Sequence, residues 1–102
     1  MSEKWFDSKN QRKKATKYYN ENEDGSNFHV VKYHATEVVK FNSDKIILNT
    51  GGWQSKTTKT RMNETSRNYD LGYSVSQEKY KWYVHYKNKK IPFEGDTLTL
   101  NR

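Results

Sequence analysis

The chain has no cysteine, a single proline and no long apolar run. The absence of cysteine excludes disulfides, thiolate zinc sites and cysteine nucleophiles, and it fits a reducing compartment. No stretch approaches the roughly 18 apolar residues of a membrane-spanning helix. The first residues, MSEKWFDSKN, lack the apolar core of a signal peptide. We therefore expect a cytoplasmic protein with no membrane partner.

Apolar side chains are scarce overall, but aromatic ones are well represented. Hydrophobic residues make up 31% of the 102 residues and charged residues 30%, while aromatic residues reach 15%. Disordered segments are poor in aromatic residues, and each aromatic side chain buries a large area. The composition therefore predicts one folded domain with a core of Tyr, Trp and Phe.

The residue pattern changes near residue 28. Residues 1–27 hold six Lys or Arg and five Asp or Glu, and we expect an N-terminal arm there, either flexible or helical over residues 8–20 with Ser8 as the cap. The stretch NENEDGSN at its end has the composition of a linker or loop. From Phe28 onward, short β-branched and aromatic segments alternate with turn residues, which is typical of strands joined by hairpins.

The later part of the chain contains one segment with helical character. Residues 57–67 could be capped by Ser55, Thr57 or Thr58, and Met62 could point into the core. We predict an α+β domain over residues 28–102. Its antiparallel sheet has about five to seven strands, and the short helix is inserted after the third.

The stretch NTGGWQSKTTKTRMNE, residues 49–64, joins a strand to this helix. A Walker-type phosphate loop needs a longer glycine loop ending in Gly-Lys-Ser/Thr, which is absent here. Two interpretations of Gly51 and Gly52 stay open. They could adopt backbone angles closed to other residues as the chain leaves the sheet, or free N–H groups beside Lys56 and Lys59 could hold an anion such as a phosphate.

Two basic groups stand out because few acidic residues lie near them. If they share a face, they form a patch, with tyrosines between the lysines, that binds phosphates non-specifically and depends strongly on salt. Trp53 would then stack on a base, although it could instead pack in the core. The alternative is a solvated lysine-rich surface. The first group is Lys56, Lys59 and Arg61; the second is Lys79, Lys81, Lys87, Lys89 and Lys90, interleaved with Tyr80, Tyr83 and Tyr86.

Catalytic and metal-binding patterns are missing from the sequence. No Cys, His and Asp cluster has the spacing of metal ligands, and no nucleophile-elbow motif is present. The carboxylates are scattered, and several fall at turns, where Asp belongs for backbone reasons. We therefore expect no catalytic residue, no metal and no cofactor.

Four segments of the sequence resemble a family of small uncharacterised proteins encoded by tailed bacteriophages, including those of cyanobacteria. The similarity covers about residues 28–95, and the N-terminal segment lies outside it. The resemblance implies production inside an infected bacterium and no particular activity or site. The segments are FHVVKYHATEVVKF, ILNTGGWQSKTTKTRMNE, YSVSQEKYKWYV and IPFEGD.

Two hypotheses of function follow from these observations. The first is non-specific binding of DNA or RNA through a basic face. The second is binding of a host or phage protein through the N-terminal arm or an edge strand, with homo-oligomers left open. The first hypothesis requires both basic groups on one face. Its predicted contact residues are Trp53, Lys56, Lys59, Arg61, Lys87, Lys89 and Lys90.

Overall fold

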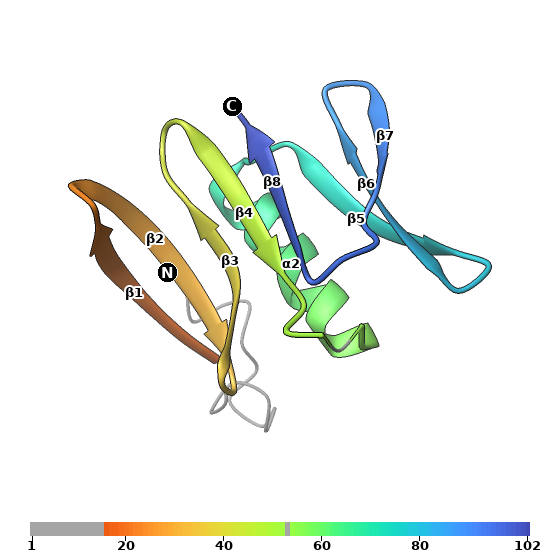
Figure 1. Ribbon diagram of the computed structural model, residues 1–102, viewed down its shortest axis with the longest axis horizontal. Coiled ribbons are helices and arrows are strands. Elements are labelled where there is room, and N and C mark those ends of the chain that lie inside the picture. Colours follow the sequence, from red (N-terminus) through yellow and green to blue (C-terminus); the bar gives the residue numbers. More distant parts are fainter. Residues whose placement is uncertain (1–15, 53) are drawn as a thin grey trace.

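The computed structural model of the protein describes residues 16–52 and 54–102, which contain eight strands and one helix (Figure 1). All strand pairs are antiparallel. The larger sheet has the order β1-β2-β3-β4-β8 and the smaller one β5-β6-β7. The elements are β1 (Thr16–Glu23), β2 (Ser26–Tyr33), β3 (Thr36–Phe41), β4 (Lys45–Asn49), α2 (Lys56–Tyr69), β5 (Tyr73–Glu78), β6 (Lys81–Tyr86), β7 (Lys89–Pro92) and β8 (Thr97–Asn101).

This architecture confirms the predicted α+β class, with antiparallel pairing and one helix inserted among the strands. Two details differ from the expectation. The strands form two sheets rather than one, and they number eight rather than about five to seven. The additional strand is β1, which lies in the segment expected to be an arm.

β1 corrects the prediction for the N-terminal segment. It pairs with β2 along its whole length, from Thr16 opposite Tyr33 to Glu23 opposite Ser26. The helix predicted over residues 8–20 is therefore wrong for residues 16–20. The partner strand overrides a weak local helical preference, because helix propensity is easily outweighed by tertiary pairing. Residues 1–15 lie outside the described residues.

The expected linker after this segment is a hairpin. Asp24 and Gly25 form the turn between β1 and β2, and both have positive φ angles, of 52° and 84°. Asp-Gly is a strong signal for a tight turn of this kind. Residues 16–27 thus belong to the larger sheet.

One hydrophobic core joins both sheets and the helix. In the smaller sheet, Val75 and Val84 are buried while Ser74 and His85 are exposed, which is the alternation of half-buried strands. Met62 of α2 is fully buried, as expected. The buried cluster consists of Val31, Val38, Val39, Phe41, Ile46, Leu48, Met62, Leu71, Tyr73, Val75, Trp82, Val84, Phe93 and Leu100.

The helix begins where the sequence predicts. Ser55 is the N-cap residue, and its side-chain oxygen accepts a hydrogen bond from the Thr58 backbone N–H at 3.1 Å. At the other end, Asp70 adopts the left-handed conformation with φ 55°, and its N–H bonds to the Ser66 carbonyl. Both ends of α2 are therefore fixed by local capping.

Polar side chains attach α2 to the smaller sheet. The Asn63 amide donates to the Val75 carbonyl at 3.0 Å and accepts from the Val75 N–H at 2.7 Å. The Ser66 hydroxyl donates to the Tyr73 carbonyl and accepts from the Tyr73 N–H. These side chains satisfy the backbone edge of β5 as a neighbouring strand would. A helix without a strong apolar stripe can therefore pack stably.

Candidate nucleic-acid interface

The two glycines before α2 serve a turn. Gly51 and Gly52 have φ angles of 68° and 83°, which favour glycine. A Cβ on Gly51 would lie 2.6 Å from the Thr36 hydroxyl oxygen. The two N–H groups donate to the side chains of Asn49 and Thr50. The backbone interpretation is confirmed, and these N–H groups are already used within the chain.

The first predicted basic group is only partly on the surface. Lys56 is exposed on the first turn of α2, Lys59 is half-buried and Arg61 is buried. Trp53 lies outside the described residues. The three cations therefore do not form a common exposed cluster.

Arg61 corrects the sequence-based prediction most clearly. Its side chain is 2% exposed, and its Nη1 donates to Glu64 Oε1 at 2.5 Å. The guanidinium also lies over the Tyr33 ring, 5.9 Å from the centroid. A buried cation that is paired inside the fold cannot contact a phosphate outside it. Arg61 is a structural residue.

The second basic group lies on the smaller sheet. Lys87 precedes β7 in the β6–β7 turn, and Lys89 and Lys90 lie on β7; all three are exposed. The Lys87 ammonium donates to the Asn101 carbonyl at 3.1 Å, so this turn lies beside the C-terminal strand. Lys79 and Lys81 are exposed at the opposite end of β6.

The lysines of the β6–β7 turn do not share a surface with the first predicted group. Figure 1 shows the β6–β7 turn near the C-terminus at one end of the molecule, whereas α2 begins at the other end. A single phosphate-binding face built from Lys56 and Lys87 together is therefore excluded. The sequence could not show this, because the separation depends on how α2 crosses behind the sheet.

The positive charge of Lys90 is balanced by an acidic residue within the smaller sheet. From β7 its side chain crosses the middle strand and meets Glu78 of β5, with an Nζ to Oε1 distance of 2.7 Å. On the way it lies over the Tyr83 ring, 4.5 Å from the centroid. The hydrogen bond to Glu78 raises the pKa of Lys90. The group is thus less uniformly basic than the sequence indicates.

The outer face of this sheet is polar and aromatic. His85 Nε2 lies 2.9 Å from the Ser76 hydroxyl on the neighbouring strand. Tyr83 is half-buried on the same face as His85, two residues along β6. Lysines, tyrosine rings and hydrogen-bonding groups therefore share one antiparallel surface.

The net charge is concentrated in this smaller sheet. Residues 73–92 hold five Lys and one Glu, so their net charge is 5 − 1 = +4, of +7 for the whole chain. Residues 16–52, with β1 to β4, hold four Lys and five Asp or Glu, which gives 4 − 5 = −1. The basic surface within the described residues is thus that of β5, β6 and β7.

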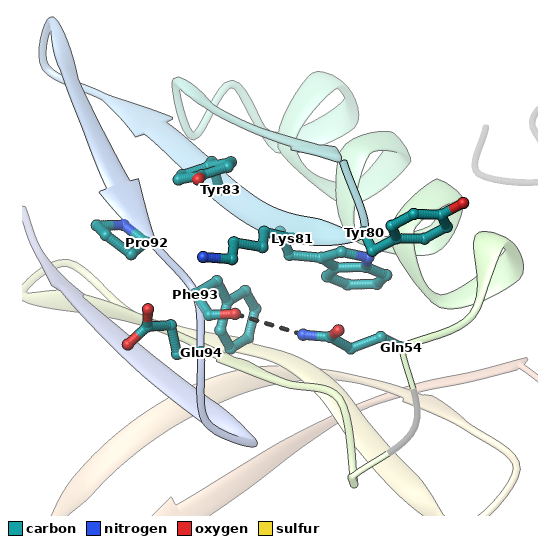
Figure 2. A pocket seen from close by; sticks show the side chains of 8 residues that line it. Gln54, Tyr80, Lys81, Tyr83, Pro92, Phe93 and Glu94 are labelled. Atoms are coloured by element: carbon teal, nitrogen blue, oxygen red, sulfur yellow. Dashed lines mark hydrogen bonds between the residues drawn. The ribbon is translucent and has the colours of Figure 1, made fainter. Parts of the chain in front are cut away.

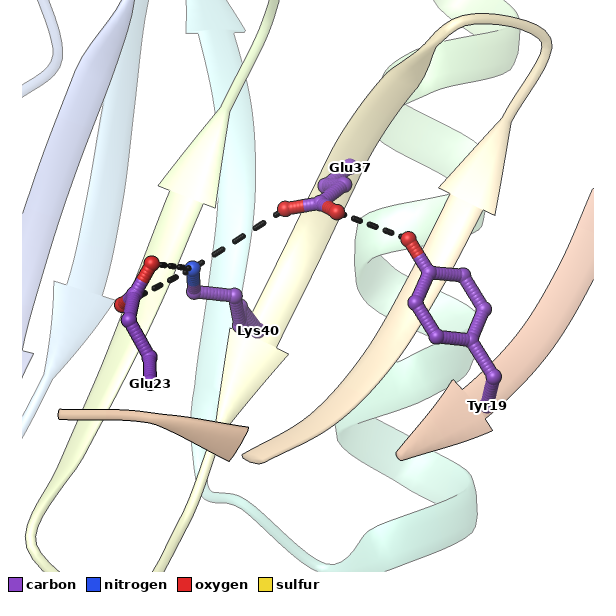
Figure 3. A network of polar contacts seen from close by, with 4 residues as sticks. All are labelled: Tyr19, Glu23, Glu37 and Lys40. Carbon is purple, nitrogen blue, oxygen red and sulfur yellow. Dashed lines mark hydrogen bonds and ion pairs between the residues drawn. The ribbon is translucent and has the colours of Figure 1, made fainter. Parts of the chain in front are cut away.

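Acidic partners neutralise lysine on the larger sheet (Figure 3). Lys40 Nζ lies 3.1 Å from Glu23 and 3.9 Å from Glu37. The Tyr19 hydroxyl donates to Glu37 at 2.7 Å, and this bond, with a smaller contribution from burial, raises the pKa of Tyr19 to about 12. This network is a local ion-pair and hydrogen-bond cluster rather than a surface for anions.

A cleft of about 300 Å³ opens beside the β5–β6 turn (Figure 2). Trp82 and Phe93 line it; they are 3% and 1% exposed and meet edge to face at a centroid distance of 6.1 Å. Figure 2 shows the Lys81 side chain between Tyr83 and Phe93, and Tyr80 at one end of the cleft. The cleft therefore combines flat apolar surfaces with an ammonium group.

Gln54 and Glu94, which no sequence motif marks, complete this cleft. Gln54 reaches it from the segment before α2 and donates to the Phe93 carbonyl at 3.3 Å. Glu94 lines the cleft and is exposed. Gln54 and Phe93 are 39 positions apart in the chain, and no local pattern indicates that such distant residues meet.

Comparisons with known proteins identify a phage family. The family model described as Kyanoviridae Gp96 protein matches residues 1–99. The match includes the N-terminal segment, so the resemblance expected for about residues 28–95 extends further than predicted. No curated protein and no solved structure matches the chain. In residues 16–52 and 54–102, no helix is long and apolar enough to cross a membrane.

Proposed function

We propose that this chain, which belongs to the Kyanoviridae Gp96 protein family, binds nucleic acid without sequence specificity through its smaller sheet. The observation that carries the proposal is the net charge of +4 within residues 73–92. A nucleic-acid backbone is a polyanion with one negative charge per phosphate, and contacts to it need no base recognition. The proposed role is binding without catalysis.

The cations are spaced along β6 in a way that suits a polyanion. Lys79 and Lys81 lie at one end of this strand, and Lys87 and Lys89 lie at the other. A six-residue strand is roughly 20 Å long, so the two pairs can contact phosphates several nucleotides apart. Lys90 contributes less because Glu78 already holds it.

A protein of a bacteriophage family is made inside an infected cell. Action in the cytoplasm, where nucleic acid of phage and host is accessible, is part of the proposal. Lys56 and Lys59, which lie at the opposite end of the molecule from Lys87 and Lys89, are not part of the proposed interface.

The test is fluorescence anisotropy with labelled single-stranded and double-stranded oligonucleotides at low salt. Four phosphate contacts give a slope of about −3 in a plot of log affinity against log salt for single strands, so affinity falls roughly 50-fold between about 50 and 200 mM salt. An absence of binding at tens of micromolar protein, or binding that ignores salt, contradicts the proposal.

A second candidate function is protein binding by strand addition. Among the described strands, β8 pairs only with β4, and β7 pairs only with β6. A groove lined by Ile91 and Leu100, among others, lies between these two edges, and an extended segment of a partner could add there. Capture of the same host or phage protein from nuclease-treated lysate, lost when Thr99→Pro blocks the β8 edge, would support this alternative.

A further inference from the structure

Tyr80 occupies a backbone position that does not suit it. It is the second residue of the two-residue turn between β5 and β6, with φ 71°, and Lys79 before it has φ 50°. Bulky residues rarely adopt positive φ, whereas Gly and Asn do so readily. In two other described turns with two positive φ angles, that second position is Gly25 and Asn88.

The Tyr80 side chain also gains little from the fold. It is 91% exposed, more than the two other exposed large hydrophobic residues, Tyr69 and Tyr19. A strained backbone that presents an aromatic ring to solvent costs stability and is not repaid by burial. Strain of this kind points to a role in binding.

The cleft beside Tyr80 has the size and surfaces for one planar group. Its volume of about 300 Å³ is at the lower end for ligand sites. Buried Trp82 and Phe93 make the floor rigid, and Tyr83 and Pro92 offer flat faces. A small flat ring fits such a cleft, whereas a stacked base pair does not.

We propose that this cleft binds an unpaired base of single-stranded nucleic acid, with Tyr80 stacking on the base and Lys79 and Lys81 contacting the flanking phosphates. The inference deepens the proposed function and rests on it. In a duplex the bases are already stacked and paired, and extracting one costs energy. The protein therefore prefers single strands to duplexes.

Charge and rim chemistry favour a base over an aromatic-binding peptide. The sheet around the cleft carries a net charge of +4, which complements phosphates flanking the base. At the rim, the Glu94 carboxylate can accept hydrogen bonds from the amino or imino N–H groups of a base, and the Gln54 carbonyl oxygen can do the same. A proline-rich peptide would use the flat rings but not the lysines.

The test compares Tyr80→Gly with the wild type by anisotropy, using a labelled oligothymidylate and a labelled duplex. Glycine relieves the positive φ, so the variant folds at least as stably as the wild type, and a loss of binding cannot come from unfolding. Single-strand affinity falls about five- to 150-fold, as expected for one lost stacking contact, while duplex affinity is unchanged. Tyr80→Trp restores binding. The matched control is Tyr69→Ala, an exposed tyrosine on α2, which leaves both affinities unchanged.

The outcomes separate the two proposals. If the wild type binds neither oligonucleotide, the proposed function fails and the base site falls with it. If the wild type binds but Tyr80→Gly binds single strands equally well, the interface stands and the base site is overturned. Displacement of the oligonucleotide by a proline-rich peptide that binds more tightly also overturns the base site, because it assigns the cleft to a protein partner.

Discussion

Arg61 and Tyr73 show how single polar residues stabilise this fold. Arg61 is buried beside Glu64 and over Tyr33, and the Tyr73 hydroxyl donates to the Met62 carbonyl at 2.6 Å. A buried polar group destabilises the fold unless it is paired. Removal of one partner therefore leaves the other buried without a hydrogen bond or ion pair, which lowers stability. Both residues therefore make testable contributions to stability.

Replacement of the buried arginine should destabilise the fold without affecting binding. Arg61→Ala leaves Glu64 without its partner and empties a large buried volume, so the free energy of unfolding falls by about 3–5 kcal/mol. Urea denaturation measures this change. Lys56→Ala, at an exposed position on the same helix, is the control and changes stability by less than about 0.5 kcal/mol. Equal effects of the two substitutions would contradict the buried position of Arg61.

Tyr73 makes stability depend on pH in the alkaline range. Burial raises the pKa of Tyr73 above its usual value of 10, so the folded state keeps the proton that the unfolded state loses. The contribution of protonated Tyr73 to stability is therefore fully present below pH 10. At higher pH the free energy of unfolding falls by about 1.4 kcal/mol per pH unit for each such buried group. Tyr18, whose pKa is also raised by burial, adds to this slope, and Tyr19, which is exposed and screened by solvent, adds less.

The substitution Tyr73→Phe tests this dependence. At neutral pH the variant loses about 1 kcal/mol with its hydrogen bond. Between about pH 10 and 11 its stability falls less steeply than that of the wild type, because one of the groups that couple proton release to unfolding is gone. Urea denaturation across this pH range measures both effects. Parallel stability curves would show that Tyr73 does not titrate with unfolding.

The sequence could not place individual residues such as Arg61. Its spacing from Lys56 and Lys59 is compatible with a solvated helix surface, and α2 lacks an apolar stripe that would fix which side faces inward. The buried side is largely polar, with Thr58, Thr65 and Ser66 beside Met62. Only the packing against β5 and β3 decides which residues are covered.

At the scale of elements, local signals predict well where a residue acts on its own backbone. Ser55 caps α2, and the positive φ angles of Gly51 and Gly52 form the turn before it. β1 was missed because a strand of polar residues depends on its partner, and no local pattern reveals the pairing with β2. The same is true of the docking of α2 on β5.

The Asn63 amide is the contact that tests this docking. Asn63→Ala removes both hydrogen bonds to the Val75 backbone, so the free energy of unfolding falls by about 2 kcal/mol. The matched control is Asn68→Ala on the same helix, where an exposed amide bonds only to the Glu64 carbonyl. This control changes stability by less than about 0.5 kcal/mol. Chemical denaturation of both variants measures these changes. An Asn63→Ala variant as stable as the wild type would contradict the role of side chains at the β5 edge.

At the scale of the whole molecule, charge is distributed unevenly between the two sheets. Composition predicts a basic protein, but not which surface carries the charge, because ion pairs such as Lys40 with Glu23 and Glu37 form between distant strands. The smaller sheet retains an excess of cations around exposed Tyr80 and half-buried Tyr83, and this arrangement makes it the proposed interface.

The most direct test of this account compares two variants of equal charge by anisotropy with a labelled oligonucleotide at low salt. One replaces Lys79, Lys81, Lys87 and Lys89 with Gln; the other replaces Lys17, Lys32, Lys40 and Lys45 of the larger sheet with Gln. Each has a net charge of 7 − 4 = +3. We expect the first to lose affinity about 100-fold and the second to stay within about threefold, because phosphate contacts act locally. Equal losses would show that net charge alone drives binding and would contradict an interface on the smaller sheet.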